Sequence, residues 1–353
     1  MGSTSLLEFT SPLNMEEVNK VIEEETLLEV QNLKMYFPIK AGIIQRVVGH
    51  VKAVDDISFR VRKGETLGIV GESGCGKSTM GRALIRLYEP TGGSVLYDGI
   101  DITKLPERAL RPLIRKKIQM IFQDPYASLN PRKSLGNLLK EPLKAHGLYA
   151  NSTERNEKIK ELLEVVGLHS SSMNYYPNEF SGGQRQRIGI ARALVLNPEL
   201  IIADEAVSAL DVSIQAQIIN LLEDLQSQFN LTYIFISHDL SVVRHIADRV
   251  GVMYLGKLVE LADKNDIYSE ALHPYTQALL SAVPTIRQKG TINRDRIILK
   301  GDIPSSSNPP TGCVFHTRCP AKIKACETIV PQLKEVQPNR FVACHLYDNP
   351  QIV

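Results

Sequence analysis

The chain has 353 residues, a length that favours one large α/β domain with an appendage, or two domains. Lys and Arg total 41 and Asp and Glu total 39, so the formal net charge is only +2. This balance gives no electrostatic reason to expect nucleic acid as a partner, and it means that an anionic ligand needs a local site.

Residues 1–26 read as a polar N-terminal extension, made acidic by Glu16, Glu17 and the three Glu of residues 23–25. They lack the basic start and long apolar core of a signal peptide. Apolar runs elsewhere fall far short of the roughly 20 residues that span a bilayer. A membrane role would therefore have to come through partner proteins.

After the extension, short apolar runs alternate with helical patterns. Runs that are apolar on both faces suit strands buried in a sheet that helices cover. Over about residues 130–185 the pattern is helical and more polar, with breaks predicted at Pro142, Gly147 and Gly167. We therefore expect an α/β domain over residues 27–283 with an inserted helical subdomain. The four predicted strands cover residues 66–70, 118–122, 200–203 and 232–237.

Residues 71–78, read GESGCGKS, match the pattern G-x-x-x-x-G-K-[ST] directly after the 66–70 strand and before a helical run over 79–87. The glycines let the backbone curl so that successive N–H groups point at phosphate oxygens, and the next helix contributes its positive end. Lys77 would neutralise the β- and γ-phosphates of ATP, and Ser78 would ligate Mg²⁺. The predicted ATP-binding residues of this loop are Gly71, Glu72, Ser73, Gly74, Cys75, Gly76, Lys77, Ser78 and Thr79.

A second element is the strand over residues 200–203, which ends in Asp204 and Glu205. Asp204 would hold Mg²⁺ through water, and Glu205 would orient and deprotonate the attacking water. General-base assistance of this kind is typically worth about 10²- to 10⁴-fold in rate. Together with the phosphate loop, these acids predict a P-loop nucleoside triphosphatase.

Residues 180–186, read FSGGQRQ, precede a helical run over 187–196 and resemble the signature sequence of the ABC ATPase family. The resemblance implies a RecA-like core sheet with helices, an inserted helical subdomain and an N-terminal antiparallel β part. In that family the Ser and second Gly, here Ser181 and Gly183, close over the γ-phosphate of ATP held by the opposite subunit. A helix N-terminus with small residues suits such an anion. The predicted nucleotide contacts of this segment are Ser181, Gly182, Gly183 and Gln184.

Three further matches follow the order of motifs in the same family. Gln123, after the 118–122 strand, resembles the Q-loop residue that contacts Mg²⁺ or the lytic water and faces the membrane subunits. Residues 208–211 resemble the D-loop, which links the two sites of a dimer and ends here in Asp211. His238 resembles the switch His that contacts the γ-phosphate.

At two positions the match to the ABC ATPase family is weaker. Tyr36 or Phe37 could stack on adenine; the resemblance favours Phe37, and an ordinary core aromatic is the alternative. The family usually has Pro after the catalytic Glu, where this chain has Ala206. Because Pro would restrict the backbone there, Ala206 puts the turnover rate in doubt but not the identity of the site.

The phosphate loop and the signature each occur once in the chain. If the resemblance holds, a complete site takes Lys77 from one chain and a signature segment from another, so that two ATP molecules join a head-to-tail dimer. ATP binding would close the pair and hydrolysis would release it. The opposing ATPase is expected to be a paralogous sister chain.

Residues 284–353 read as a linker followed by a small Cys-rich module that contains Cys313, Cys319, Cys326 and Cys344. Four thiolates suit either Zn²⁺ or a [4Fe–4S] cluster, and their spacing departs from the C-x₂-C pairs usual in zinc modules, which favours iron–sulfur. Four reduced cysteines packed as small hydrophobic side chains, with no metal, are the alternative. The fifth cysteine, Cys75, is interpreted as a small residue of the phosphate loop; a somewhat acidified, oxidation-prone thiol near a helix N-terminus is the alternative.

The Cys-rich C-terminal segment within residues 284–353, together with residues 273–279 (HPYTQAL), resembles the C-terminal segment of oligopeptide/dipeptide and nickel importer ATPases. Some of those proteins carry a [4Fe–4S] cluster. The resemblance implies an ATPase that energises import of di- and oligopeptides at the cytoplasmic face of the bacterial cell membrane. It also implies two transmembrane permease subunits and, indirectly, an extracellular peptide-binding protein. The alternatives are import of nickel or another small solute, a non-transport ABC ATPase of translation or DNA repair, and a small-molecule kinase.

Overall fold

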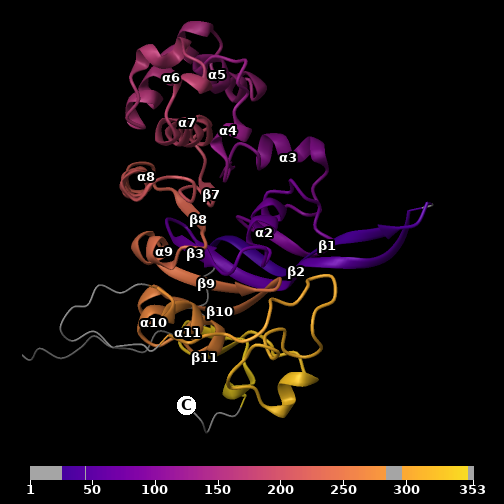
Figure 1. Ribbon diagram of the computed structural model, residues 1–353. Helices are drawn as coiled ribbons and strands as arrows, with labels where there is room; N and C mark the ends of the chain where they lie inside the picture. Colours follow the sequence, from indigo (N-terminus) through magenta and orange to yellow (C-terminus); the bar gives the residue numbers. More distant parts are fainter. Residues whose placement is uncertain (1–25, 44, 284–295, 349–353) are drawn as a thin grey trace, which may run out of the picture.

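The computed structural model describes residues 26–43, 45–283 and 296–348. The predicted N-terminal extension before Thr26 and the start of the predicted linker lie outside these residues. Figure 1 shows three connected parts: a central sheet with helices against it, an antiparallel sheet that carries a long hairpin, and a group of helices at one end of the molecule.

An eight-stranded sheet forms the centre of the fold. Its strands are β3 (Thr66–Val70), β6 (Ile118–Ile121), β7 (Leu200–Asp204), β8 (Thr232–Ile236), β9 (Arg249–Tyr254), β10 (Lys257–Asp263), β11 (Lys334–Gln337) and β12 (Arg340–Val342). They lie in the order β11-β12-β10-β9-β3-β8-β7-β6. The strands from β9 to β6 are parallel, and β10, β12 and β11 extend the β9 edge antiparallel. All four predicted strands are confirmed, as β3, β6, β7 and β8.

Both faces of this sheet are buried, each against a different hydrophobic core. Every residue of β3, β7 and β8 is buried. Successive side chains of a strand point to opposite faces. Accordingly Ile202 and Ile234 belong to one core and their neighbours Ile201 and Tyr233 to the other. This explains why the strands read as continuous apolar runs rather than as alternating ones.

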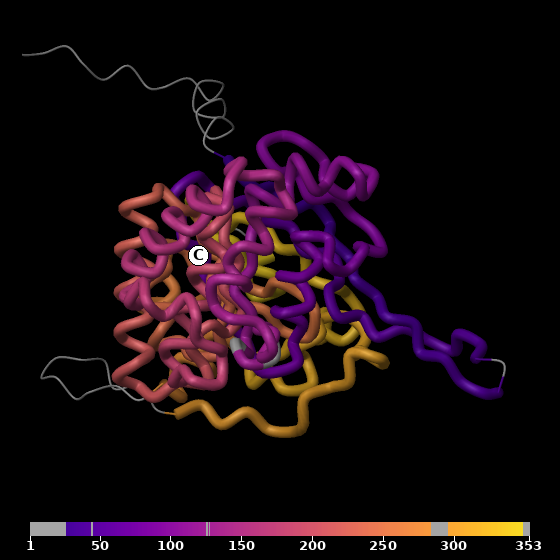
Figure 2. The backbone as a smooth tube through the Cα atoms, turned by 90° about the horizontal axis from the view of Figure 1, so that it is seen from above, coloured from indigo at the N-terminus to yellow at the C-terminus, as the bar shows by residue number. Residues whose placement is uncertain are grey.

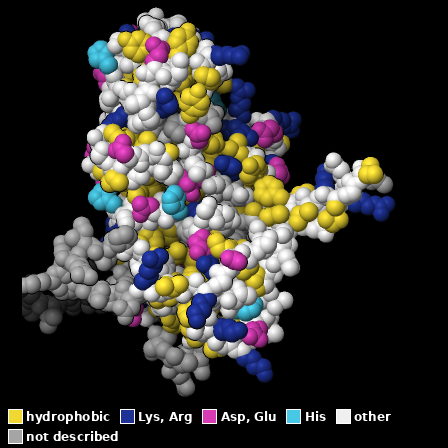
Figure 3. All heavy atoms as spheres, in the orientation of Figure 1, with side chains coloured by type: hydrophobic (Ala, Val, Ile, Leu, Met, Phe, Trp, Pro, Cys, Tyr) yellow, Lys and Arg dark blue, Asp and Glu magenta, His cyan; other side chains and the backbone are white. Residues whose placement is uncertain are grey.

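The smaller sheet is antiparallel, with the order β2-β1-β4-β5. Its strands are β1 (Thr26–Ala41), β2 (Arg46–Arg62), β4 (Gly92–Tyr97) and β5 (Ile100–Asp101). It supplies the N-terminal antiparallel part that the family resemblance implies. The outer half of the β1–β2 hairpin projects well away from the body, as Figures 1 and 2 show, and its exposed end carries hydrophobic and basic side chains (Figure 3).

Helices cover the two faces of the central sheet (Figure 1). Apart from the helical subdomain, they are α2 (Lys77–Leu84), α3 (Glu107–Leu113), α8 (Val212–Phe229), α9 (Leu240–Ile246), α10 (Lys264–Ser269) and α11 (Pro274–Ser281). The helix after the phosphate loop begins at Lys77, two residues before the predicted run, because Gly76 is its N-cap. Within the described ranges, none of the helices has the length and apolar character needed to cross a membrane.

The predicted helical subdomain is present and begins slightly earlier than expected. It comprises α4 (Pro125–Ser128), α5 (Leu135–Ala145), α6 (Ser152–Val165), η1 (Ser170–Asn174), η2 (Pro177–Glu179) and α7 (Gly182–Leu194). Gly147 and Gly167 follow α5 and α6 with left-handed φ angles of 64° and 73°, as a helix end requires. The predicted break at Pro142 is wrong, because Pro142 lies inside α5 and its carbonyl accepts a hydrogen bond from the N–H of His146.

The C-terminal segment is attached to the central sheet rather than set apart as a separate module. β12 pairs with β10, with Phe341 opposite Leu261, and the N–H of Ala343 donates to the carbonyl of Val259 at 2.9 Å. In the described part of this segment the other elements are β11, which pairs with β12, and two short 3₁₀ turns, η3 (Lys324–Glu327) and η4 (His345–Tyr347). Sheet pairing between strands about 80 residues apart gives no local sequence signal, which is why the sequence indicated an appendage.

Candidate nucleotide site

The phosphate loop runs from the end of β3 to the start of α2, and its glycines have conformations that other residues rarely adopt. Gly71, Gly74 and Gly76 have φ angles of 152°, 79° and 105°. A Cβ atom on Gly76 would lie 2.0 Å from the carbonyl oxygen of Ala53, and one on Gly71 would lie 2.2 Å from that of Met253. The loop is therefore packed directly against the backbone of β2 and β9, and only glycine fits at these two positions.

Lys77 lies inside the curl of this loop and is only 4% exposed. Its Nζ donates hydrogen bonds to the carbonyl oxygens of Gly71 at 2.7 Å and Glu72 at 3.0 Å. Ser73 and Gly74 are exposed at the tip of the loop, and Thr79 is half-buried in α2. A buried ammonium surrounded by a glycine loop at a helix N-terminus is the arrangement that binds a polyphosphate.

Asp204 ends β7 beside the first turn of α2. The hydroxyl of Ser78 donates to Asp204 Oδ1 at 2.6 Å, and Arg82 Nη2 lies 3.7 Å from Oδ2. Asp204 is fully buried, and burial raises the pKa of its carboxyl. Among the described residues, Oδ2 accepts no hydrogen bond. A hydroxyl and an unsatisfied buried carboxylate oxygen are hard oxygen donors, so these side chains fit Mg²⁺.

Glu205 follows Asp204 and meets side chains from the ends of two neighbouring strands. Gln123 Nε2, after β6, donates to Glu205 Oε2 at 2.8 Å, and His238 Nδ1, after β8, lies 3.4 Å from the same oxygen. The carboxyl ends of adjacent parallel strands lie at one edge of the sheet, which brings these three residues together. The structure thus places three of the predicted catalytic side chains at one carboxylate oxygen.

The backbone of Glu205 is held in a left-handed conformation, with φ of 47°. Its N–H donates to the carbonyl of Ile236, and its carbonyl accepts from both the N–H and the hydroxyl of Ser208. Ala206, which stands where the family usually has Pro, is buried beside it. Hydrogen bonds from β8 and the D-loop segment therefore restrain this turn without a proline ring.

The signature segment forms the N-terminus of α7. The hydroxyl of Ser181 accepts from the N–H of Gln184, and the side chain of Gln184 accepts from the N–H of Ser181, which is a capping box. A Cβ atom on Gly183 would lie 2.6 Å from Ile214 of α8, whose N-terminus is capped by Asp211. In the described part of the chain, no hydrogen bond or ion pair joins residues 181–184 to residues 71–79. Within one chain the two halves of the predicted site are therefore separate.

Comparison with known proteins decides the family. A family model described as "ABC transporter" matches residues 54–208, and one described as "Oligopeptide/dipeptide transporter, C-terminal region" matches residues 259–326. The oligopeptide transport ATP-binding protein AppF of Bacillus subtilis is 65% identical over 324 residues, which cover 92% of this chain and 98% of that protein. The chain belongs to the ABC transporter family. A putative oligopeptide transport ATP-binding protein of the same organism, YkfD, is 56% identical over 92% of this ABC protein and 97% of its own length.

Solved structures of the family have the same fold as this ABC protein. A dimeric, post-hydrolysis structure of the ATP-binding cassette MJ0796, bound to ADP and Pi, is similar with a TM-score of 0.60 and 30% identity. The similarity covers 67% of this chain and 99% of that one. The protein cbiO1 of Clostridium perfringens, part of an ABC transporter complex, has a TM-score of 0.59 and 25% identity over 70% and 92% of the two chains. The predicted ABC ATPase fold is confirmed.

The aromatic residues predicted near adenine occupy opposite faces of β1. The ring of Phe37 packs edge-to-face against Tyr88, with ring centroids 5.5 Å apart, at the margin of the core that includes α2. The hydroxyl of Tyr36 donates to Asp55, and burial raises its pKa. Tyr36 is therefore engaged by its own chain, and adenine stacking on Phe37 stays a prediction.

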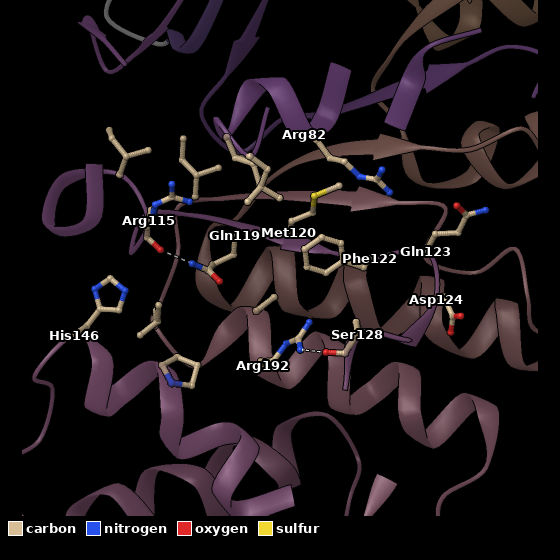
Figure 4. Close-up of a pocket in the computed structure, with 17 residues that line it drawn as sticks. Arg82, Arg115, Gln119, Met120, Phe122, Gln123, Asp124, Ser128, His146 and Arg192 are labelled. Carbon is tan, nitrogen blue, oxygen red and sulfur yellow. Dashed lines mark hydrogen bonds between the residues drawn. The ribbon is translucent and has the colours of Figure 1, made fainter. Parts of the chain in front are cut away.

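A groove of about 740 Å³ lies between α2, β6 and the helical subdomain of this ABC protein. Figure 4 shows Gln123 at one end of the groove and His146 at the other, with Phe122 and Arg192 between them. Gln123 therefore lines the groove and also contacts Glu205. The groove therefore reaches Gln123, whose amide is one hydrogen bond from the candidate catalytic carboxylate.

The predicted metal site in the C-terminal segment is not supported by the arrangement of its side chains. Cys313, Cys326 and Cys344 are buried and Cys319 is half-buried, and none forms a disulfide. Burial, with a smaller contribution from the neighbouring thiols, raises the pKa of Cys313 to about 11 and of Cys344 to about 12. Over the residues that the structure describes, no group of three or more His, Cys, Asp or Glu side chains could hold a metal ion.

Cys75 is a small buried residue of the phosphate loop, and the alternative of an acidified thiol is contradicted. Burial of this thiol raises its pKa, and this effect outweighs the charge of Lys77 nearby. The helix N-terminus and the lysine, both visible in the sequence, favour the thiolate. The packing that buries Cys75 comes from the fold, since its carbonyl accepts a hydrogen bond from Gly256, at the turn between β9 and β10.

Two residues near the site were missed by sequence reasoning. Arg82, beside Asp204, lies one helical turn after Ser78, and this spacing of four residues was a usable signal. Arg318 forms an ion pair with Glu72 of the phosphate loop across a separation of 246 residues. Nothing in the sequence predicts that contact.

Proposed function

We propose that this chain is the ATP-binding and ATP-hydrolysing subunit of an ABC transporter that imports di- and oligopeptides. The observation that carries the proposal is the similarity over 92% of the chain to AppF, whose name describes oligopeptide transport. The match of residues 259–326 to an oligopeptide/dipeptide transporter region supports the same substrate class. The alternative is that the transported substrate is nickel or another small solute.

The geometry supports the following roles of the site residues in ATP hydrolysis. Lys77 and the N–H groups of residues 71–79 bind the phosphates, while Ser78 and Asp204 hold the Mg²⁺ that offsets phosphate charge when bound. Glu205 orients water and accepts its proton at Oε2. Gln123 and His238 position that carboxylate oxygen, because both lie within 3.4 Å of it.

The proposed working unit contains two ATPase chains. Ser181, Gly182 and Gln184 are exposed at the N-terminus of α7, as is Asp211 at the start of α8. These residues are accessible to a neighbouring chain and are not joined to their own phosphate loop. We propose that the signature segment of a sister chain closes over ATP bound at Lys77, and that hydrolysis lets the two chains part.

The proposed partners in the membrane are two transmembrane permease subunits that hold this chain at the cytoplasmic face of the bacterial cell membrane. The groove beside Gln123 supports this proposal, since it is largely apolar and carries Arg82, Arg115 and Arg192. Gln123 itself contacts Glu205. An extracellular peptide-binding protein would supply the substrate to the permease. No nucleic acid partner is proposed.

Purification of the full chain from its native membrane tests this function. We expect two polytopic membrane proteins and a second ABC ATPase to copurify, and peptides to stimulate ATP hydrolysis in the reconstituted assembly. The charge reversal Arg115→Glu in the groove should reduce recovery of the membrane proteins several-fold. Lys104→Glu, at an exposed lysine outside the groove, is the matched control. Recovery of ribosomes or DNA in place of membrane proteins would support the non-transport alternative.

We further propose a [4Fe–4S] cluster in the C-terminal segment, on the chemistry of the donors alone. The thiols of Cys313, Cys319 and Cys326 lie near enough to Cys344 to contribute to the rise in its pKa, and the corners of a cluster accept thiolates spaced more widely than those around a single ion. The raised pKa values of Cys313, Cys319 and Cys344 keep these metal-free thiols protonated, so cluster binding would have to displace protons.

Anaerobically purified protein should then contain about four iron and four sulfide per chain and absorb visible light. Cys326→Ser is expected to remove both the iron and the absorption. Cys75→Ser, outside the C-terminal segment, should leave the iron content unchanged. Protein that contains zinc alone, or no iron, would rule out the cluster.

A further inference from the structure

The phosphate loop contains one acidic side chain, Glu72, directly after Gly71. A carboxylate in this loop opposes the binding of a polyanion, because the two like charges repel one another at short range. The side chain is only partly exposed, so solvent screens it incompletely. A site built to bind triphosphate therefore has to neutralise this charge or direct it away from the phosphates.

The structure supplies a partner for Glu72 from the far end of the chain. Arg318 Nη1 lies 2.8 Å from Glu72 Oε2, and Nη2 lies 3.1 Å from Oε1. These two parallel contacts form a bidentate pair, the strongest geometry between Arg and a carboxylate. The side chain of Arg318 is 9% exposed, and its second neighbour is the hydroxyl of Tyr254 at 3.5 Å.

The surroundings hold Arg318 in place. Phe315, three residues earlier, is fully buried against the rings of Tyr254 and Tyr275, with centroids 5.1 and 5.4 Å away. The hydroxyl of Tyr275 in turn accepts a hydrogen bond from the N–H of Glu72 at 2.9 Å. Glu72 is thus fixed at its backbone by α11 and at its carboxylate by the C-terminal segment.

We infer that Arg318 is a positioning residue of the nucleotide site, which neutralises Glu72 and holds its carboxylate away from the phosphates. The C-terminal segment then sets the affinity of the phosphate loop for ATP. This inference rests on the proposed function only in taking ATP as the ligand of the loop. Arg318 acts through Glu72 and touches no reacting atom.

A double-mutant cycle on the full chain tests the inference, with the dissociation constant of a fluorescent ATP analogue as the readout. Arg318→Gln leaves the Glu72 carboxylate unpaired beside the phosphates, and we expect affinity to fall about tenfold. The double variant Arg318→Gln with Glu72→Gln removes the repelling charge and should recover affinity to within about twofold of the original. Arg318→Lys keeps the charge without the planar fork and should lie between the two.

Arg340→Gln is the matched control, since Arg340 is another buried arginine of the C-terminal segment, paired with Gln337 and Glu270 instead of the phosphate loop. Its ATP affinity should be unchanged, with thermal melting of each variant showing that it is folded. Unchanged affinity in Arg318→Gln, or a double variant as weak as the single one, would overturn the inference. If Lys77→Ala also left affinity unchanged, the proposed function itself would fail.

Discussion

Replacing Glu205 with Gln should lower the rate of ATP hydrolysis about 10²- to 10⁴-fold. The amide has nearly the same shape as the carboxylate, but it cannot accept a proton from water. Gln123 and His238 both converge on one oxygen of this carboxylate, at 2.8 and 3.4 Å. ATP binding should persist, because the phosphate loop is intact, and the ATP-bound pair of chains should therefore accumulate.

Single-turnover release of phosphate, compared with equilibrium ATP binding on the same protein, measures this effect. Glu223→Gln is the control, since Glu223 lies on α8 and its nearest charged partner is His245. That variant should hydrolyse ATP at the original rate. A Glu205→Gln protein with unchanged turnover would show that another group takes the proton.

Lys77→Ala should weaken ATP binding about 10- to 100-fold, because hydrogen bonds from a charged donor are worth about 1.5–3 kcal/mol. The ammonium is buried in the loop, where no water can take over its role at low cost. The expected loss is in affinity as well as in rate, which separates this variant from Glu205→Gln.

Titration with a fluorescent ATP analogue measures the loss, with and without Mg²⁺. Lys104→Ala removes a lysine that is 80% exposed and paired with Asp101, so it controls for a general change in charge. Unchanged affinity in Lys77→Ala, with the control also unchanged, would contradict the assignment of the phosphate loop.

Much of the site could be predicted because its residues follow local rules. The phosphate loop is a contiguous segment between a strand and a helix, and glycine at positions 71 and 76 is required by the backbone of β2 and β9. Gln123, Glu205 and His238 each follow an apolar run, and parallel pairing of those runs brings their ends together. Sequence order was therefore enough to predict their proximity.

The features that the sequence did not predict depend on contacts between distant segments. Pairing of β12 with β10 and the contact of Arg318 with Glu72 join residues about 80 and 246 positions apart. The alternative of an acidified thiol at Cys75 fails because burial raises the pKa of this thiol more than the nearby positive charge lowers it. Pro142 continues α5 although its type usually ends a helix, which shows tertiary packing overriding a local preference.

One consequence follows from the position of Gln123, which lines the groove and donates to Glu205 Oε2. A partner bound in that groove would be separated from Glu205, the proposed proton acceptor, only by the side chain of Gln123 and its hydrogen bond. A small displacement of this amide would break or restore its hydrogen bond to the carboxylate, which His238 also contacts. Contact with a partner in the groove and the position of the catalytic carboxylate would then both depend on the side chain of Gln123.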